Sequence, residues 1–165
     1  MTSFFPIGLD VEQPRSPIEI LNEAAFEWRQ KSQDRLNLLL HKSRDASGHF
    51  HIMVTARDQR SGRSATLFHV IHRYDAHYPA TFKVDSEDLP QFLQRIYETE
   101  YYRGYDDDSP PEYIENLWVC ADAVEFSSKL EKVFNLADVK TSVYNLLAGP
   151  SPSEIDESKE NTTTK

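Results

Sequence analysis

The sequence predicts an α+β fold: an N-terminal helix, an antiparallel β-meander of about four strands, and C-terminal helices packed on one sheet face. Two patterns predict it. Apolar residues recur at helical spacing in residues 16–33 and again after residue 122, whereas residues 36–41 and 49–56 alternate with a period of two. The connections between these strands are short, and short connections join antiparallel neighbours. We therefore expect the second sheet face to be at least partly open.

The first expected helix covers residues 16–33 and follows an irregular leader, residues 1–15. Ser16-Pro17-Ile18-Glu19 is a capping box with proline at the first helical position, because Ser16 and Glu19 can each accept the other's backbone amide. The residues that share its apolar face are Leu21, Ala24, Ala25 and Trp28.

Four strands are expected next, and turn formers separate the first three. The third is apolar on both faces, as in the middle of a sheet. Tyr78-Pro79 interrupts the pattern before the fourth, since proline cannot donate to a ladder. The tip of the connection between the second and third strands is expected at Ser61-Gly62. The four segments are Leu36–His41, His49–Ala56, Ala65–Tyr74 and Ala80–Asp85.

The C-terminal half is predicted to be mainly helical. A helix opened by Asp85–Asp88 is expected to run through Ile96 and Tyr97, followed by a loop over Tyr101–Pro111 and a short strand over Leu117–Ala121. A second capping box, Asp122–Glu125, opens the next helix. Asn135 is expected to cap the last helix, which Gly149-Pro150 ends. Residues 150–165 have the composition of a disordered tail, which leaves one domain over residues 16–149.

Composition excludes several classes of protein. The net charge is −9, which argues against nucleic-acid binding, because phosphate contacts need basic surface. The single cysteine, Cys120, excludes an internal disulfide framework and fits a cytoplasmic protein. No segment is long and apolar enough for a membrane span. The sequence lacks the glycine-rich motifs that cradle phosphates, so we expect no cofactor.

The charges are unevenly distributed. Residues 41–83 hold seven Lys and Arg against three Asp (+4), whereas Glu98–Glu115 holds seven acids against one arginine (−6). Separated charge of opposite sign can steer a binding partner. The basic part includes three arginines at the expected hairpin tip, suited to carboxylate or phosphate: Arg57, Arg60 and Arg63. The alternative is a solvated loop.

The acidic part mixes tyrosines with aspartates, a composition that suits contact with a basic protein surface. Its members are Tyr101, Tyr102, Tyr105, Asp106, Asp107 and Asp108. The alternative interpretation is a disordered solvating loop.

All six histidines lie in residues 41–83. His49 and His51 share a strand face, and a turn at Ser61-Gly62 would place His51 opposite His72. Three imidazoles in one patch could bind zinc, but no motif with metal-ligand spacing supports this, and we assign no metal. A half-exposed sheet face that tolerates histidine is the main alternative, and a pH-responsive surface is another. Cys120 lies among apolar residues and is expected to be a buried structural thiol.

Two stretches, SPIEILNEAAFEWRQKSQDRL (residues 16–36) and LFHVIHRYDAHYP (residues 67–79), resemble an uncharacterised family of small bacterial α+β proteins. The resemblance places His72, Asp75, Tyr78 and Pro79 on a stretch of that family and implies no activity. YPATFKV is also similar to the Tyr-Pro strand turn of ubiquitin-conjugating and RWD domains. No His-Pro-Asn tripeptide precedes Cys120, so we reject an enzyme of that kind.

The expected function is a non-enzymatic, cytoplasmic protein-binding module, either immunity- or antitoxin-like or an accessory component of a bacterial conflict system. Its partner is expected to be a protein with a basic surface. A small acidic secretion-type chaperone is one alternative, and a hydrolase or nuclease that uses the histidine patch is another.

Overall fold

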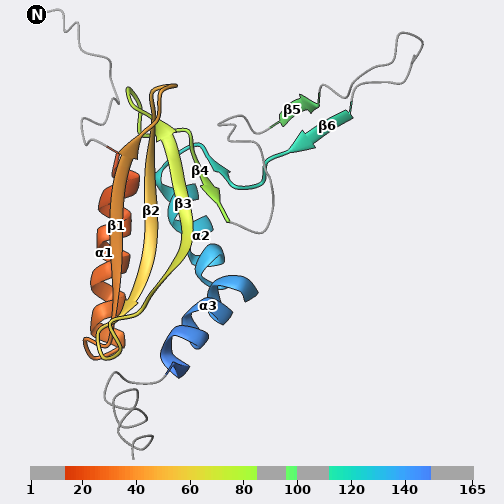
Figure 1. Ribbon diagram of the computed structural model, residues 1–165. Helices are drawn as coiled ribbons and strands as arrows, with labels where there is room; N and C mark the ends of the chain where they lie inside the picture. The colour runs from red at the N-terminus through yellow and green to blue at the C-terminus, as the bar shows by residue number, and fades with distance from the viewer. Residues whose placement is uncertain (1–13, 85–95, 100–111, 150–165) are drawn as a thin grey trace, which may run out of the picture.

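The computed structural model describes residues 14–84, 96–99 and 112–149, and it confirms the α+β fold (Figure 1). One helix precedes a five-stranded antiparallel sheet with the strand order β1-β2-β3-β4-β7, and two helices follow it. The helices are α1 (Pro17–Lys31), α2 (Ala123–Phe134) and α3 (Ala137–Ala148). The strands of this sheet are β1 (Leu36–Arg44), β2 (His49–Asp58), β3 (Ser64–Arg73), β4 (Ala80–Lys83) and β7 (Val119–Cys120).

The start and end of α1 agree with the sequence prediction. The Ser16 amide donates to Glu19 Oε2 at 2.7 Å, and the Glu19 amide donates to Ser16 Oγ at 3.4 Å, so the capping box is present. The hydrogen bond from the Ser16 amide is the main cause that lowers the pKa of Glu19. The chain leaves the helix through Gln33 and Asp34, both of which have positive φ. A left-handed backbone reverses the chain direction there and starts β1.

All three helices lie on one face of the sheet (Figure 1). Aromatic rings fill the space between them: Phe82 stacks on Phe126 with centroids 4.7 Å apart, and Phe68 meets Phe134 edge to face at 5.4 Å. Phe68 and Phe126 are fully buried. Burial of apolar side chains between sheet and helices stabilises this arrangement.

A β-bulge in β3 shifts the register of the central hairpin. Val54 pairs with Phe68 but Thr55 pairs with Thr66, so Leu67 is an extra residue without a partner across the ladder. Leu67 and Phe68 are consecutive, yet both are buried in the core cluster. The bulge thus adds one apolar side chain to the helix side of the sheet.

The predicted helix through Ile96 and Tyr97 is wrong at those two residues. They belong to β5 (Ile96–Thr99), which pairs with β6 (Glu112–Glu115) in a separate two-stranded sheet. Ile, Tyr and Thr favour strands, and pairing with β6 outweighs the helical periodicity of the preceding sequence. The rest of that predicted helix lies outside the described residues. The sequence analysis did not predict β6, because its glutamates follow an acidic, proline-containing segment.

Two capping predictions need correction. Asn135 does not cap the last helix; its amide donates to the carbonyls of Glu131 and Lys132, which makes it the C-cap of α2. α3 begins after Leu136, which has no side-chain cap. At the start of α2, Asp122 accepts from the Glu125 amide as predicted, but Glu125 accepts from the Ala121 amide and not from that of Asp122.

The predicted domain limits fall largely on residues outside the description: residues 1–13 of the leader and the whole tail, 150–165. Among the described residues, no helix is long and apolar enough to cross a membrane.

Candidate functional site

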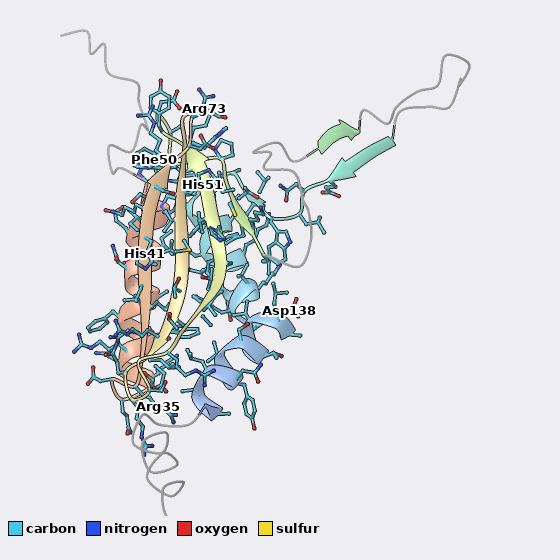
Figure 2. All side chains as sticks on the ribbon, viewed as in Figure 1. Arg35, His41, Phe50, His51, Arg73 and Asp138 are labelled. Atoms are coloured by element: carbon cyan, nitrogen blue, oxygen red, sulfur yellow. The ribbon has the colours of Figure 1, made fainter. Side chains whose placement is uncertain are left out.

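The structure corrects the assumed pairing of His51 with His72. His51 pairs with Ile71, and His72 pairs with Phe50, one position away from the assumed register. Neighbours along a strand point to opposite faces, so a slip of one residue separates the two histidines. His51 and His41 lie on the face of the sheet away from the helices, the open face (Figure 2). His72 is paired with Phe50 and lies on the helix side. The three-histidine patch predicted from the sequence is therefore not formed.

His49 and His51 instead share a carboxylate at the β1–β2 turn. Asp45 Oδ2 lies 2.9 Å from His51 Nε2 and 3.5 Å from His49 Nδ1, and Asp45 Oδ1 accepts from the His49 amide at 2.9 Å. The hydrogen bond to His51 is the main cause that lowers the pKa of Asp45 to about 2. The turn is thus held by an ionised aspartate, which is a structural role.

This cluster does not form a catalytic triad. Ser43 is the residue directly opposite His51 in the ladder, but the His51 side chain bonds to Asp45 and no hydrogen bond joins the Ser43 hydroxyl to the His51 ring. An activated serine needs a base within hydrogen-bond reach. Within the described part of the chain, no group of three His, Cys, Asp or Glu side chains could hold a metal ion.

His72 is buried, with Nδ1 2.7 Å from the carbonyl oxygen of Arg73 and 3.2 Å from that of Ala76. Its ring stacks on Phe50 with centroids 5.6 Å apart. These contacts fix the chain where β3 turns toward Tyr78-Pro79, so His72 serves the fold.

The three arginines predicted at the hairpin tip are all exposed, but their surroundings differ. The side chains of Arg57 and Arg60 make no ion pair with any described residue. Arg63 lies against Gly149 at the C-terminal end of α3, so closely that a side chain at position 149 would collide with its guanidinium. Cations are favourable at a helix C-terminus, and α3 has no basic residue in its last turn.

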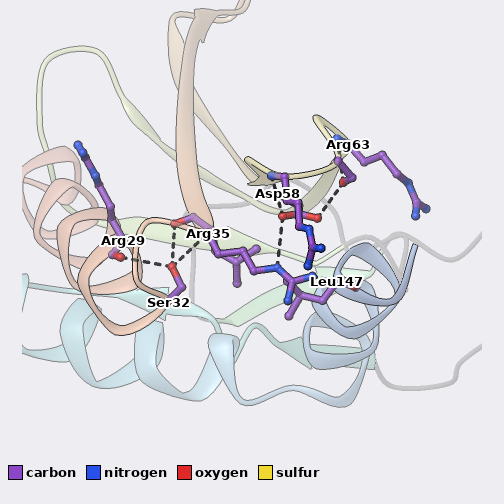
Figure 3. Close-up of polar contacts among 9 residues, drawn as sticks. Arg29, Ser32, Arg35, Asp58, Arg63 and Leu147 are labelled. Atoms are coloured by element: carbon purple, nitrogen blue, oxygen red, sulfur yellow. Dashed lines mark hydrogen bonds and ion pairs between the residues drawn. The ribbon is translucent and has the colours of Figure 1, made fainter. Parts of the chain in front are cut away.

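Beside this tip lies a polar network centred on Asp58 (Figure 3). The Asp58 carboxylate is 1% exposed and accepts from Ser61 Oγ at 2.8 Å and from the Arg60 amide at 3.1 Å. Arg35 Nε lies 3.5 Å from the same carboxylate, while Arg35 Nη2 donates to the carbonyl of Leu147 at 2.9 Å. The network joins the hairpin tip, the start of β1 and the end of α3.

The tyrosines and aspartates of the acidic segment (Tyr101, Tyr102, Tyr105, Asp106, Asp107 and Asp108) lie outside the described residues. The chain that carries them connects β5 to β6, and the antiparallel pairing of these strands places Thr99 opposite Glu112.

Cys120 is fully buried in β7, and burial raises the pKa of its thiol to about 12. We expect iodoacetamide at pH 8 to alkylate the folded protein at least about a hundredfold more slowly than the same protein in denaturant, since the thiolate is the reactive form. Mass spectrometry over time measures both rates. Equal rates would show that Cys120 is accessible and ionisable in the folded chain.

Sequence reasoning missed a groove of about 830 Å³ between α1 and α2. The ring of Trp28, from α1, contacts the ring of Phe134, from α2, with centroids 5.0 Å apart. Both rings are only partly buried. Its apolar lining includes Ile20, Ala24, Trp28, Leu130, Phe134 and Val143. Helical spacing places Ala24 and Trp28 on the apolar face of the first helix, but it does not reveal how closely two helices approach.

The rim of the groove is mainly acidic. Glu23 and Glu27 of α1 lie on one side and Glu131 of α2 on the other. Arg15 and Lys31 are at the two ends of α1, where they pair with Glu23 and Glu27 respectively. The carboxylate of Glu131 is exposed and has no cationic partner among the described residues. The groove thus combines an apolar lining with a rim carboxylate, that of Glu131, which has no cationic partner among the described residues.

Comparison with protein-family models, with curated proteins and with solved structures gave no match to this chain.

Proposed function

We propose that this chain is a non-enzymatic protein-binding module and that the α1–α2 groove receives an apolar segment of its partner. The supporting observation is the groove itself: about 830 Å³ of space lined by partly buried aromatic rings. Concave sites with aromatic walls and a few polar groups are typical binding sites, and grooves between helices accept amphipathic segments.

The charges of the rim favour a cationic partner. A Lys or Arg beside the apolar residues of the incoming segment would meet Glu131, whose carboxylate is otherwise unpaired among the described residues. The net charge of −9 acts in the same direction at longer range. A cytoplasmic immunity- or antitoxin-like protein, or an accessory component of a bacterial conflict system, would use such a site to hold a basic partner.

The alternative functions have weaker support. A hydrolase or nuclease that uses His49, His51 and His72 would need them on one face of the sheet, and the register separates His72 from the other two. A secretion-type chaperone would need a surface that binds extended segments, and the open sheet face is the candidate for it. That function also predicts a homodimer.

A fluorescence titration tests the groove. The probe is a helical amphipathic peptide of leucine and lysine, titrated into the full chain carrying Trp118→Phe, so that Trp28 alone reports binding. We expect Glu131→Lys to weaken binding about fivefold to thirtyfold, because one attraction of about 1 kcal/mol is lost and a repulsion is added.

Asp138→Lys is the matched control, because Asp138 is exposed at the start of α3 and does not line the groove. It makes the same charge change and should leave the affinity close to that of the parent. Binding that Glu131→Lys does not weaken, or that is equally tight when glutamates replace the lysines of the peptide, would contradict the proposal.

A further inference from the structure

β1 is a long strand at the edge of the sheet. It has nine residues, and its ladder with β2 runs over nine consecutive pairs without a bulge. Within the described part of the chain, β1 pairs with β2 alone, and Figure 1 shows it as the outermost strand on its side. Alternate residues of an antiparallel strand point their backbone groups away from the neighbour. Ser32 Oγ binds those of Leu36, so about four further residues of β1 present N–H and C=O groups that have no partner among the described residues.

Proteins usually protect such an edge, because it is a template for pairing with another chain. β1 contains no proline and no bulge, and both would interrupt pairing. The opposite edge of the sheet, β7, is only two residues long. The sheet therefore offers one extended edge to a further strand.

The side chains of β1 define what kind of strand fits. Its first half is apolar, with Leu38, Leu39 and Leu40, whereas His41, Lys42 and Arg44 are all exposed near its end. The Arg44 guanidinium lies over the ring of Tyr74, 4.5 Å from its centroid, and Lys42 has no ion pair among the described residues. A matching segment would carry apolar residues opposite the leucines and a carboxylate opposite Lys42.

A second copy of this chain fits the edge poorly. Of the five strands, α1 packs most closely on β1. Neighbouring strands of a sheet are about 4.8 Å apart, whereas the axes of two packed helices are about 8–10 Å apart. If two β1 strands paired, the α1 helix above each strand would be held at the strand spacing, and the two helices would collide. A separate extended segment has no such helix.

We propose that β1 binds an extended, acidic segment of another protein as an added antiparallel strand. This interface is separate from the α1–α2 groove, and neither proposal depends on the other. Backbone hydrogen bonds along β1 would hold the segment, and Lys42 and Arg44 would fix its orientation by attracting carboxylates at its amino-terminal end.

The test is amide hydrogen exchange of the full chain, measured residue by residue by NMR. The probe is a ten-residue peptide of alternating valine and threonine with glutamates in its amino-terminal third. Alternate amides of β1, those without a partner in β2, should exchange at least about tenfold more slowly with bound peptide, while amides of β3 and β7 keep their rates. A peptide with lysines replacing the glutamates should protect them far less.

Two variants of equal charge change complete the test. Lys42→Glu should weaken binding about fivefold, and Lys140→Glu, on the exposed surface of α3, should leave it unchanged. Unchanged β1 exchange rates at saturating peptide would overturn the proposal. So would equal protection by the lysine peptide, or a dimer of the free chain in which β1 amides are already protected.

Discussion

Phe126→Ala is expected to lower the free energy of unfolding by about 3–5 kcal/mol, the largest single loss that we predict for this chain. Phe126 is fully buried, stacks on Phe82, and meets Tyr78 edge to face with centroids 6.3 Å apart. Removing the ring leaves a cavity between α2 and the sheet, and the rigid strands cannot close it. Urea denaturation followed by circular dichroism measures the change.

Val124→Ala on the same helix is the control. Val124 is 80% exposed, so its truncation removes little buried surface, and alanine is the better helix former. We expect a change of less than about 0.5 kcal/mol. Equal losses in the two variants would show that α2 is not held against the sheet through Phe126.

Asp58→Ala is expected to cost about 2–3 kcal/mol, because it removes hydrogen bonds to a charged acceptor and leaves buried donors unpaired. The groups affected are Ser61 Oγ, the Arg60 amide and the partly buried guanidinium of Arg35. Asp75→Ala is the matched control: Asp75 pairs with Arg73, but both side chains are largely exposed, and we expect a loss below about 1 kcal/mol. Similar losses in the two variants would contradict the role given to the Asp58 network.

Asp58 also makes the stability of the folded protein depend on pH in acid. Burial opposes ionisation of Asp58, but the hydrogen bonds from Ser61 and Arg60 and the charge of Arg35 outweigh it, so the pKa in the folded state lies below 3.8. A group with a lowered folded pKa stabilises the protein at neutral pH, and that stabilisation is lost as pH falls below about 4. The difference in the free energy of unfolding between the parent and Asp58→Ala, measured by denaturation from pH 7 to 3, should therefore narrow below about pH 4. A difference that stays constant over this range would contradict this.

Much of the fold could be predicted from local signals. The capping box at Ser16, the N-cap Asp122 and the alternation in β1 and β2 depend on residues close in sequence, and the structure confirms these helix starts and strands. The register of β2 and β3 could not be predicted, because it depends on a five-residue turn and on the bulge at Leu67. β5 and β6 were missed for a similar reason, since each four-residue strand is recognisable only beside the other.

The candidate site was less predictable than the fold. Exposure of Arg60 follows from its place in the turn between β2 and β3, whereas Arg57 belongs to β2, one residue before its end. The position of Arg63 against Gly149 depends on a contact between distant parts of the chain. The groove depends on the distance between α1 and α2, and the network of Asp58 needs Arg35 from the connection between α1 and β1. Such features arise from tertiary packing, which periodicity does not encode.

The hydrogen bond from Arg35 to Leu147 has a consequence for folding kinetics. It joins residues 112 positions apart, whereas consecutive strands of the meander are joined by connections of only a few residues. Closing so long a loop costs entropy, so contacts across the meander should form before this one. Interactions absent from the transition state change the unfolding rate and hardly change the folding rate. The loss of Arg35 should therefore shorten the lifetime of the native state, while the rate at which the chain reaches that state stays almost the same.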